Sequence, residues 1–311
     1  MCGVAPDAVE VALGVLGDLA ERDVPLGPMT TYRVGGAAAV LVRARSRDDL
    51  RSVADASRRS GLPVLAVGRG SNMLVADRGY PGIAVLTTEL PERIEVDEQT
   101  SIVRASAGVS LPVLARRTAA AGLTGFEWAV GVPGSLGGAV RMNAGGHGSD
   151  IAAALVDVTV IDLAHDGVER VLVAADLGLG FRSSALPATS IVVEASLQLA
   201  PGDRRRSEEE ISEIVAWRRK HQPGGQNAGS VFVNPVPGEL SAGQLIDESG
   251  LRGLRVGSAH VSEKHANFIQ ADDGGSAADV RALMQLVRDR VEQSTGWSLR
   301  SEIRLIGFDD R

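Results

Sequence analysis

The sequence predicts an α+β fold in which a two-lobed region of strands and helices precedes a smaller α/β domain. In the first lobe, a strand over 37–43 leads into a helix that starts at Ser46-Arg-Asp-Asp49 and ends at Gly61. A strand over 62–67 follows directly. A strand, a helix and a strand within about 30 residues are typical of the crossover unit of an α/β layer.

Beyond Gly82 the pattern changes to short segments of strand character, with one helical stretch over 111–121. The expected strands are 83–86, 102–105, 155–162, 168–173 and 191–199. Together these segments predict a second lobe that continues the first.

A charged segment over 207–220 predicts a helix with an acidic first turn and a basic last turn, which suits the helix dipole. Farther on, an apolar stripe over 276–295 predicts a core helix, and a final strand is expected over 299–306. We therefore divide the chain into an N-terminal extension at 1–23, a two-lobed region at 24–200 with lobes at about 24–86 and 87–200, and a smaller domain at 201–311.

Composition excludes several classes of protein. With 44% hydrophobic and 23% charged residues, the 311-residue chain is too apolar to be disordered. Its net charge of −7, without a basic stripe, argues against a nucleic-acid partner. The single cysteine, Cys2, excludes an intramolecular disulfide, and the histidines lack metal-ligand spacing. Without a secretory signal over 1–10 or a membrane-length apolar run, we expect a cytoplasmic monomer that holds no metal.

Two glycine-rich loops are candidates for holding a nucleotide. Gly68-Arg-Gly-Ser-Asn72 follows a strand, and its glycines let main-chain N–H groups converge on phosphate oxygens. A simple tight turn is the alternative, because the spacing is not that of the dinucleotide fingerprint. The segment 131–146 has six glycines in 16 residues, a density that suits close approach to a flat ligand or to phosphates. An irregular connection between two strands is equally compatible with that density.

Several motifs resemble a known family when taken in order. They are Thr31-Tyr-Arg-Val-Gly-Gly36, Gly68-Arg-Gly-Ser-Asn-Met-Leu74, the segment 131–146, Gly180-Phe-Arg-Ser-Ser184, His221-Gln-Pro223 with Asn227-Ala-Gly-Ser-Val-Phe-Val-Asn-Pro235, Ala242-Gly-Gln-Leu-Ile-Asp247, Lys264-His-Ala-Asn-Phe268 and Leu299-Arg-Ser-Glu-Ile-Arg304. This series, from about Leu26 to Gly307, resembles the UDP-N-acetylenolpyruvoylglucosamine reductases, also called UDP-N-acetylmuramate dehydrogenases. The resemblance implies an FAD-binding region of the vanillyl-alcohol-oxidase type followed by a substrate-binding domain. It also implies NADPH as electron donor and UDP-N-acetylglucosamine enolpyruvate as substrate, in peptidoglycan precursor synthesis.

The same resemblance assigns the binding residues. Those expected to contact FAD are Tyr32, Gly68, Arg69, Gly70, Ser71, Asn72, Met73, Gly131, Pro133, Gly134, Ser135, Gly138, Ala139 and Asn143. Those expected to bind the substrate are Arg141, Lys220, Gln222, Asn234 and Asn267.

The resemblance also assigns three catalytic residues: Arg182, Ser230 and Glu302. The guanidinium of Arg182 suits a carboxylate that gains charge, although an arginine in general more often forms a surface ion pair. Ser230 matches a proton donor to an enolate carbon, although serine after glycine is a routine turn residue. Glu302 is expected in an apolar strand where burial would raise its pKa, and its alternative is a solvent-facing residue paired with a neighbouring arginine.

The sequence departs from the family pattern at several points. Val233 replaces a lysine of many relatives, so Arg218, Arg219 or Lys220 would have to supply that diphosphate contact. Arg141 replaces an aromatic residue, and the stretch between 200 and 229 is too short for a tyrosine-bearing lid, as in the short subfamily. Two alternative functions stay open at this point. A flavin-dependent hydroxy-acid or alcohol oxidase leaves Ser230 and Glu302 without a task, and a catalytically silent nucleotide-sugar binder would not need the three polar residues.

Overall fold

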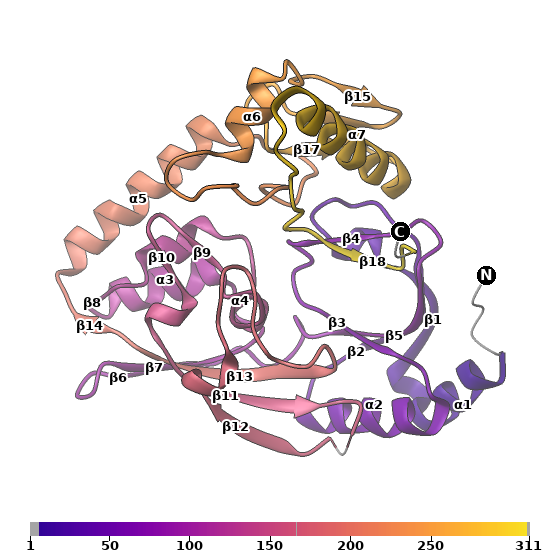
Figure 1. Ribbon diagram of the computed structural model, residues 1–311. Helices are drawn as coiled ribbons and strands as arrows, with labels where there is room; N and C mark the ends of the chain where they lie inside the picture. Colours follow the sequence, from indigo (N-terminus) through magenta and orange to yellow (C-terminus); the bar gives the residue numbers. More distant parts are fainter. Residues whose placement is uncertain (1–5, 166, 310–311) are drawn as a thin grey trace. The chain divides into compact units, whose positions relative to one another are not determined.

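The computed structural model describes residues 6–165 and 167–309, which form two compact units that alternate along the chain (Figure 1). Unit 1 contains the residues up to Asp23, Ala39–Arg69 and Pro81–Arg218. Unit 2 contains Val24–Ala38, Gly70–Tyr80 and the residues from Arg219 onward. The units therefore differ from the consecutive segments expected from the sequence, because 24–38 and 70–80 bury Tyr32, Val34 and Leu74 in the core of unit 2.

The first sheet of unit 1 has the strand order β1–β2–β5–β3, and its outer strand β1 follows the N-terminal helix. The elements are α1 (Pro6–Leu16), β1 (Ala20–Pro25), β2 (Ala37–Arg43), α2 (Arg47–Ser60), β3 (Val64–Val67) and β5 (Tyr80–Leu86). β3 pairs in parallel with β5, so β5 lies between the two strands of the expected crossover unit. α1 and α2 run side by side along this sheet (Figure 1). Because Ala12 and Leu16 of α1 are buried in the shared core, α1 is an integral part of unit 1.

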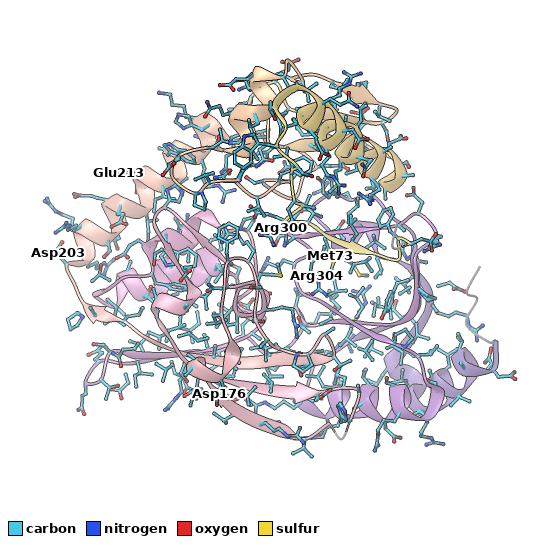
Figure 2. All side chains as sticks on the ribbon, in the orientation of Figure 1. Met73, Asp176, Asp203, Glu213, Arg300 and Arg304 are labelled. Carbon is cyan, nitrogen blue, oxygen red and sulfur yellow. The ribbon has the colours of Figure 1, made fainter. Side chains whose placement is uncertain are left out.

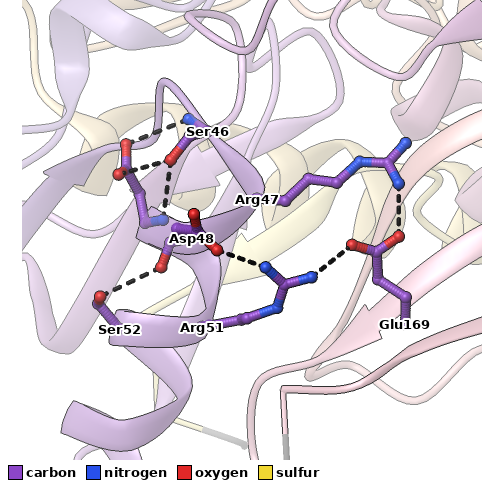
Figure 3. Close-up of polar contacts among 7 residues, drawn as sticks. Ser46, Arg47, Asp48, Arg51, Ser52 and Glu169 are labelled. Atoms are coloured by element: carbon purple, nitrogen blue, oxygen red, sulfur yellow. Dashed lines mark hydrogen bonds and ion pairs between the residues drawn. The ribbon is translucent and has the colours of Figure 1, made fainter.

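The start of α2 is fixed as the sequence predicts. The Ser46 hydroxyl accepts a hydrogen bond from the Asp49 main-chain N–H at 3.1 Å, and the Asp49 carboxylate accepts one from the Ser46 N–H at 3.2 Å. Figure 3 shows that the same helix end is joined to β12 (Glu169–Val173) by ion pairs of Arg47 and Arg51 with Glu169. These ion pairs are largely exposed, so the capping box contributes more to the position of the helix.

The second sheet of unit 1 is antiparallel throughout the described pairings, in the order β12–β11–β13–β7–β6. Its other strands are β6 (Ile94–Asp97), β7 (Ile102–Ser106), β11 (Leu155–Asp162) and β13 (Ser190–Gln198), and it is accompanied by α3 (Leu111–Ala120) and α4 (Leu136–Met142). Short pairs join β8 (Leu123–Thr124) to β14 (Ala200–Pro201) and β9 (Gly145–Gly146) to β10 (Ser149–Asp150). Single-turn 3-10 helices occupy Gly17–Leu19, Gly27–Met29, Glu127–Gly131, Ile151–Ala153 and Ala174–Leu177.

Helix α5 (Arg204–His221) corrects one detail of the sequence prediction. The helix begins three residues earlier than expected, so its first turn holds Arg204–Arg206 and no acidic residue. The Asp203 carboxylate accepts a hydrogen bond from the Arg206 N–H at 2.8 Å and caps the helix at this point. The Ser207 hydroxyl donates to the buried Glu127 carboxylate at 2.6 Å and anchors the helix to unit 1.

Unit 2 packs α6 (Ala242–Glu248) and α7 (Ala277–Thr295) with an antiparallel sheet of β15 (Arg255–Val256), β16 (Ala259–Val261) and β17 (Ile269–Ala271). The apolar stripe of α7 is buried as expected. The strand β18 (Arg304–Ile306) pairs in parallel with β4 (Met73–Val75), and Figure 2 labels the partners Met73 and Arg304. The expected strand over 299–306 is therefore too long, because residues 300–302 pair elsewhere, with 231–233.

Candidate active site

The loop that follows β3 has the properties of an anion-binding nest. Gly70 has a φ of 58°, and a Cβ there would lie 2.3 Å from the Met29 carbonyl oxygen, so only glycine fits. In the described part of the chain, the main-chain N–H groups of residues 69–72 donate no hydrogen bond to protein. Adjacent N–H groups with a left-handed residue between them are suited to phosphate oxygens.

Tyr32 contributes a second feature that suits a ligand. Its side chain is fully buried, and within the described ranges its hydroxyl has no hydrogen-bond partner. Burial raises the pKa of this hydroxyl above its usual value, so it stays protonated as a donor. The neighbouring Thr31 N–H donates to the Gly70 carbonyl at 3.1 Å, which ties the Tyr32 segment to the loop. A buried hydroxyl without a protein partner is costly, and this one fits a phosphate or ribose oxygen of a cofactor.

Within unit 1, the structure places Gly68, which begins the first glycine-rich loop, against the second loop. A Cβ on Gly68 would lie 2.8 Å from the Ser135 hydroxyl oxygen, and the Ser135 hydroxyl caps α4 by accepting from the Gly138 N–H. A Cβ on Gly137 would lie 2.8 Å from the Cβ of Ala107 in the core. The glycines therefore permit close approach of main chain, as the density of glycine predicts. Ala139 faces the core, whereas Pro133 is exposed.

Asn143 has a structural task that the sequence does not reveal. It is 4% exposed and has a φ of 38° at the end of α4. Its side-chain oxygen accepts from the Ala152 N–H at 2.9 Å, and its amide nitrogen donates to the Gly180 carbonyl and to Asp150, both at 3.1 Å. Asn143 therefore braces the turn that carries Arg182, whereas the sequence places it among the FAD contacts.

Arg182 lies at the tip of a tight turn in which Gly180 and Ser183 pair with each other. Its φ of 52° is unusual for a residue with a side chain and is a kind of strain that clusters at functional sites. One guanidinium nitrogen, Nη2, donates to the Gly145 carbonyl at 2.9 Å, which joins the turn to the glycine-rich segment. Arg182, Asn143 and the glycine-rich segment 131–146 thus form one connected group in unit 1.

Arg141 also has a structural task. Its guanidinium donates to the carbonyl oxygens of Leu186 at 3.3 Å and Pro187 at 3.1 Å, and it contacts that of Ser190. Its own carbonyl accepts from the Ser184 hydroxyl at 2.8 Å. These bonds fix the segment that follows the Arg182 turn, and the substrate contact expected of Arg141 stays a prediction.

In unit 2 the structure brings Ser230 and Glu302 together on two paired segments. The Glu302 N–H donates to the Val231 carbonyl at 2.8 Å, and Phe232 forms a bridge with Ser301. Both Ser230 and Glu302 are half-buried. Glu302 lies in the short stretch that pairs with residues 231–233 and precedes β18, so the expectation that it lies in the final strand is wrong.

The Asn72 loop is tied to the same pairing. The Asn72 side-chain amide donates to the Glu302 carbonyl at 3.1 Å, and the Arg304 N–H donates to the Asn72 carbonyl at 3.1 Å. An expected cofactor-binding loop and two expected catalytic residues therefore share one hydrogen-bonded framework. Met73, which follows this loop, is a buried strand residue of β4.

The other expected substrate residues of unit 2 differ in their burial and in their hydrogen-bond partners. Asn267 is 3% exposed and pairs with the main chain of Phe232. The Asn234 oxygen accepts from the Ala242 N–H at 3.1 Å beside α6. The Gln222 side-chain oxygen is buried without a partner among the described residues, which suits a ligand donor, and Lys220 is exposed.

One residue near the glycine-rich segment was not singled out by the sequence. The imidazole of His147 meets Trp217 of α5 edge to face with ring centroids 5.2 Å apart. A Cβ on Gly131 would lie 3.2 Å from the His147 ring, and His147 has a φ of 50°. The sequence feature that could have identified His147 is its place as a non-glycine residue between Gly146 and Gly148.

Over 6–165 and 167–309, no group of histidine, cysteine and carboxylate side chains is suited to a metal ion. The helices in these same ranges are either too short or too polar to cross a bilayer.

Comparisons with known proteins agree with these features. Residues 38–171 match the model of an FAD binding domain, and residues 221–306 match the C-terminal domain of UDP-N-acetylenolpyruvoylglucosamine reductase. The reductase of Heliobacterium modesticaldum is 42% identical over 91% of this chain and 89% of its own length. That of Gloeobacter violaceus is 42% identical over 93% of this chain and 97% of its own. The crystal structure of the Thermus caldophilus enzyme is 36% identical, has a TM-score of 0.77, and aligns over 92% of this chain and 98% of that one.

These matches confirm the α+β fold class, with an FAD-binding region and a smaller C-terminal domain. They also confirm the resemblance that the ordered motifs indicate. The chain is a member of the UDP-N-acetylenolpyruvoylglucosamine reductase family.

Proposed function

We propose that this protein is an NADPH-dependent flavoenzyme that reduces UDP-N-acetylglucosamine enolpyruvate to UDP-N-acetylmuramate in peptidoglycan precursor synthesis. The observation that carries the proposal is the pairing of the Ser230 and Glu302 segments in a chain of this family. An alcohol or hydroxy-acid oxidase would leave that pair without a task. A silent binder would not need a strained arginine at 182.

The residues present fit FAD as the cofactor. The N–H groups of residues 69–72 would hold its diphosphate, and the buried Tyr32 hydroxyl would donate to one of its oxygens. Because Gly68 has no side chain, the Ser135 hydroxyl can lie directly against its main chain. When bound, FAD supplies the hydride chemistry that no side chain can provide, with NADPH as the donor.

Each of the three polar residues then has a distinct role. Hydride addition to the terminal methylene carbon of the substrate moves negative charge toward its carboxylate, where the Arg182 guanidinium would stabilise it. Ser230 would donate its hydroxyl proton to the carbon that bears the carboxylate. Glu302, held on the segment paired with that of Ser230, would orient the Ser230 hydroxyl or return a proton to it.

NADPH and nucleotide sugars are cytoplasmic metabolites, which supports a cytoplasmic location. We expect a monomer by size-exclusion chromatography.

The two half-reactions test this proposal. The purified protein should show a flavin absorbance that NADPH bleaches anaerobically, and the enolpyruvyl nucleotide sugar should restore it. In Ser230→Ala, bleaching should proceed as in the wild type, while restoration should slow by about 100-fold or more. Ser249→Ala, which removes a hydroxyl that donates within unit 2 to the Leu245 carbonyl, is the matched control. If the nucleotide sugar does not restore the wild-type absorbance, the proposed function is wrong.

A further inference from the structure

The segment that carries Ser230 is held from one side by a single buried residue, Asn267. The Asn267 side-chain oxygen accepts from the Phe232 N–H at 2.9 Å, and its amide nitrogen donates to the Phe232 carbonyl at 2.8 Å. The Asn267 carbonyl accepts from the Val231 N–H at 2.8 Å. One residue therefore uses three hydrogen bonds to fix the two positions that follow Ser230.

The opposite side of this segment is held by the chain that carries Glu302. The Val231 carbonyl accepts from Glu302, and the Val233 N–H donates to the Arg300 carbonyl at 2.9 Å. Residues 231–233 thus lie between Asn267 and residues 300–302, and their main chain is hydrogen-bonded on both sides. Gly229, with a φ of 79°, precedes Ser230 and offers no side-chain packing to hold it. The position of the Ser230 hydroxyl therefore depends on the residues after it.

The burial of Asn267 decides between two roles. At 3% exposure, its amide is turned toward Phe232 and not toward solvent. A side-chain amide that both donates to and accepts from the main chain of one residue imitates the hydrogen bonds of a neighbouring β-strand. Such a pair of bonds restricts the movement of that main chain. The Phe232 bonds use one amide N–H and one oxygen lone pair, and at this burial little of the remaining side chain is within reach of a substrate. Burial and the paired bonds therefore support a positioning role, and the substrate contact that the family resemblance implies stays a prediction.

We propose that Asn267 is a positioning residue that holds Ser230 in place for proton delivery. This inference rests on the proposed function, because it assumes that Ser230 donates the proton that completes reduction. Loss of the amide frees the main chain of Phe232 and lets the Ser230 hydroxyl move. A displacement of about 1 Å at a reacting group can cost about 100-fold in rate. Substrate affinity and reduction by NADPH do not depend on this position.

A double-mutant cycle tests the inference by stopped-flow measurement of both half-reactions. Asn267→Ala should leave bleaching by NADPH and the substrate Kd within about twofold of wild type, and slow restoration about 10- to 100-fold. In a Ser230→Ala background, Asn267→Ala should slow restoration by less than about threefold, because the group that it positions is gone. Asn267→Asp, which keeps the acceptor for the Phe232 N–H, provides a second variant should alanine prevent folding.

A matched control separates positioning from general loss of stability. Ser258→Ala removes a hydroxyl of unit 2 that donates to the Asp279 carboxylate at 2.7 Å and accepts from the Ser276 N–H at 2.9 Å. It should lower the melting temperature without slowing restoration selectively. Equal slowing in both serine backgrounds, or a raised substrate Kd, would overturn the inference. If wild-type flavin is not restored at all, the failure lies with the proposed function instead.

Discussion

Two buried asparagines, Asn143 in unit 1 and Asn267 in unit 2, brace the segments that carry the expected catalytic residues. Asn143 is in the left-handed region and bonds to three residues, among them Gly180 of the Arg182 turn. Asn267 pairs its side chain with Phe232 alone, in both directions. The first brace depends on an unusual backbone conformation as well as on hydrogen bonds, whereas the second depends on hydrogen bonds only. We therefore expect unit 1 to be more sensitive to substitution at its brace.

The largest expected effect is that of Asn143→Ala. The change removes the bonds to Ala152, Gly180 and Asp150, and it leaves an alanine in a conformation that side chains disfavour. We expect a loss of about 3 kcal/mol in unfolding free energy, measured by urea denaturation, together with reduced activity.

Asn143→Gly separates the two contributions, because glycine accepts the left-handed conformation without cost. It should lose about 1 kcal/mol less than the alanine variant. Equal losses in both variants would show that the backbone conformation is unimportant and would remove the distinction between the two braces.

The next effect is expected at the glycine that Arg182 contacts. A Cβ on Gly145 would lie 2.5 Å from the Ser149 carbonyl oxygen, so Gly145→Ala should cost about 2 kcal/mol in unfolding free energy. The adjacent Gly146→Ala is the matched control, since a Cβ there meets no atom within 4 Å in the described structure. Similar melting temperatures for the two variants would contradict the close approach at Gly145.

A smaller effect is expected in unit 2 at Asp77, which caps α7 from a distant part of the chain. Its carboxylate accepts from the Ser276 hydroxyl at 2.8 Å and from the N–H groups of Ala277 and Ala278, both at 2.9 Å. Asp77→Ala should lower the unfolding free energy by about 1 kcal/mol, as the loss of a helix cap does. Asp289→Ala, on the exposed face of α7, should change it by less than about 0.5 kcal/mol.

The smallest effect is a pH dependence around Asn267. The Asn267 N–H donates to Nδ1 of His265, and burial, followed by the nearby charge of Arg252, lowers the pKa of this imidazole. Because its pKa is lower in the folded state, its contribution to stability is present above the unfolded value of about 6.5 and is lost as the pH falls. Unfolding free energy should therefore decline below that pH in wild type, and His265→Gln should flatten the decline. An unchanged slope would exclude this contribution.

The sequence predicts the features that reside in single residues or short patterns. The helix start at Ser46 and the loops at Gly70 and Gly137 could be located, because a capping box and clustered glycines are visible in a few consecutive residues. The hydrogen bonds of Asn143 and Asn267 could not be predicted, because their partners lie 37 and 35 residues away along the chain. An asparagine in a sequence does not indicate which distant main-chain group its amide will bind. The start of α5 was misplaced for a related reason. The acidic run at 208–210 resembles a first turn, while the actual cap is Asp203 (Figure 2).

The alternation of the chain between the two units has a consequence during synthesis. Residues 24–38 and 70–80 leave the ribosome early, but their partners in unit 2 lie beyond residue 218. Strand β4 cannot pair until residues 304–306 have been made, because β18 is its partner. The apolar side chains of Val34 and Leu74 therefore remain exposed to solvent for most of translation. Nascent chains in this state are prone to aggregate and are bound by chaperones. A ribosome that stalls before residue 300 would release a chain in which the Ser230 segment has no Glu302 segment to pair with.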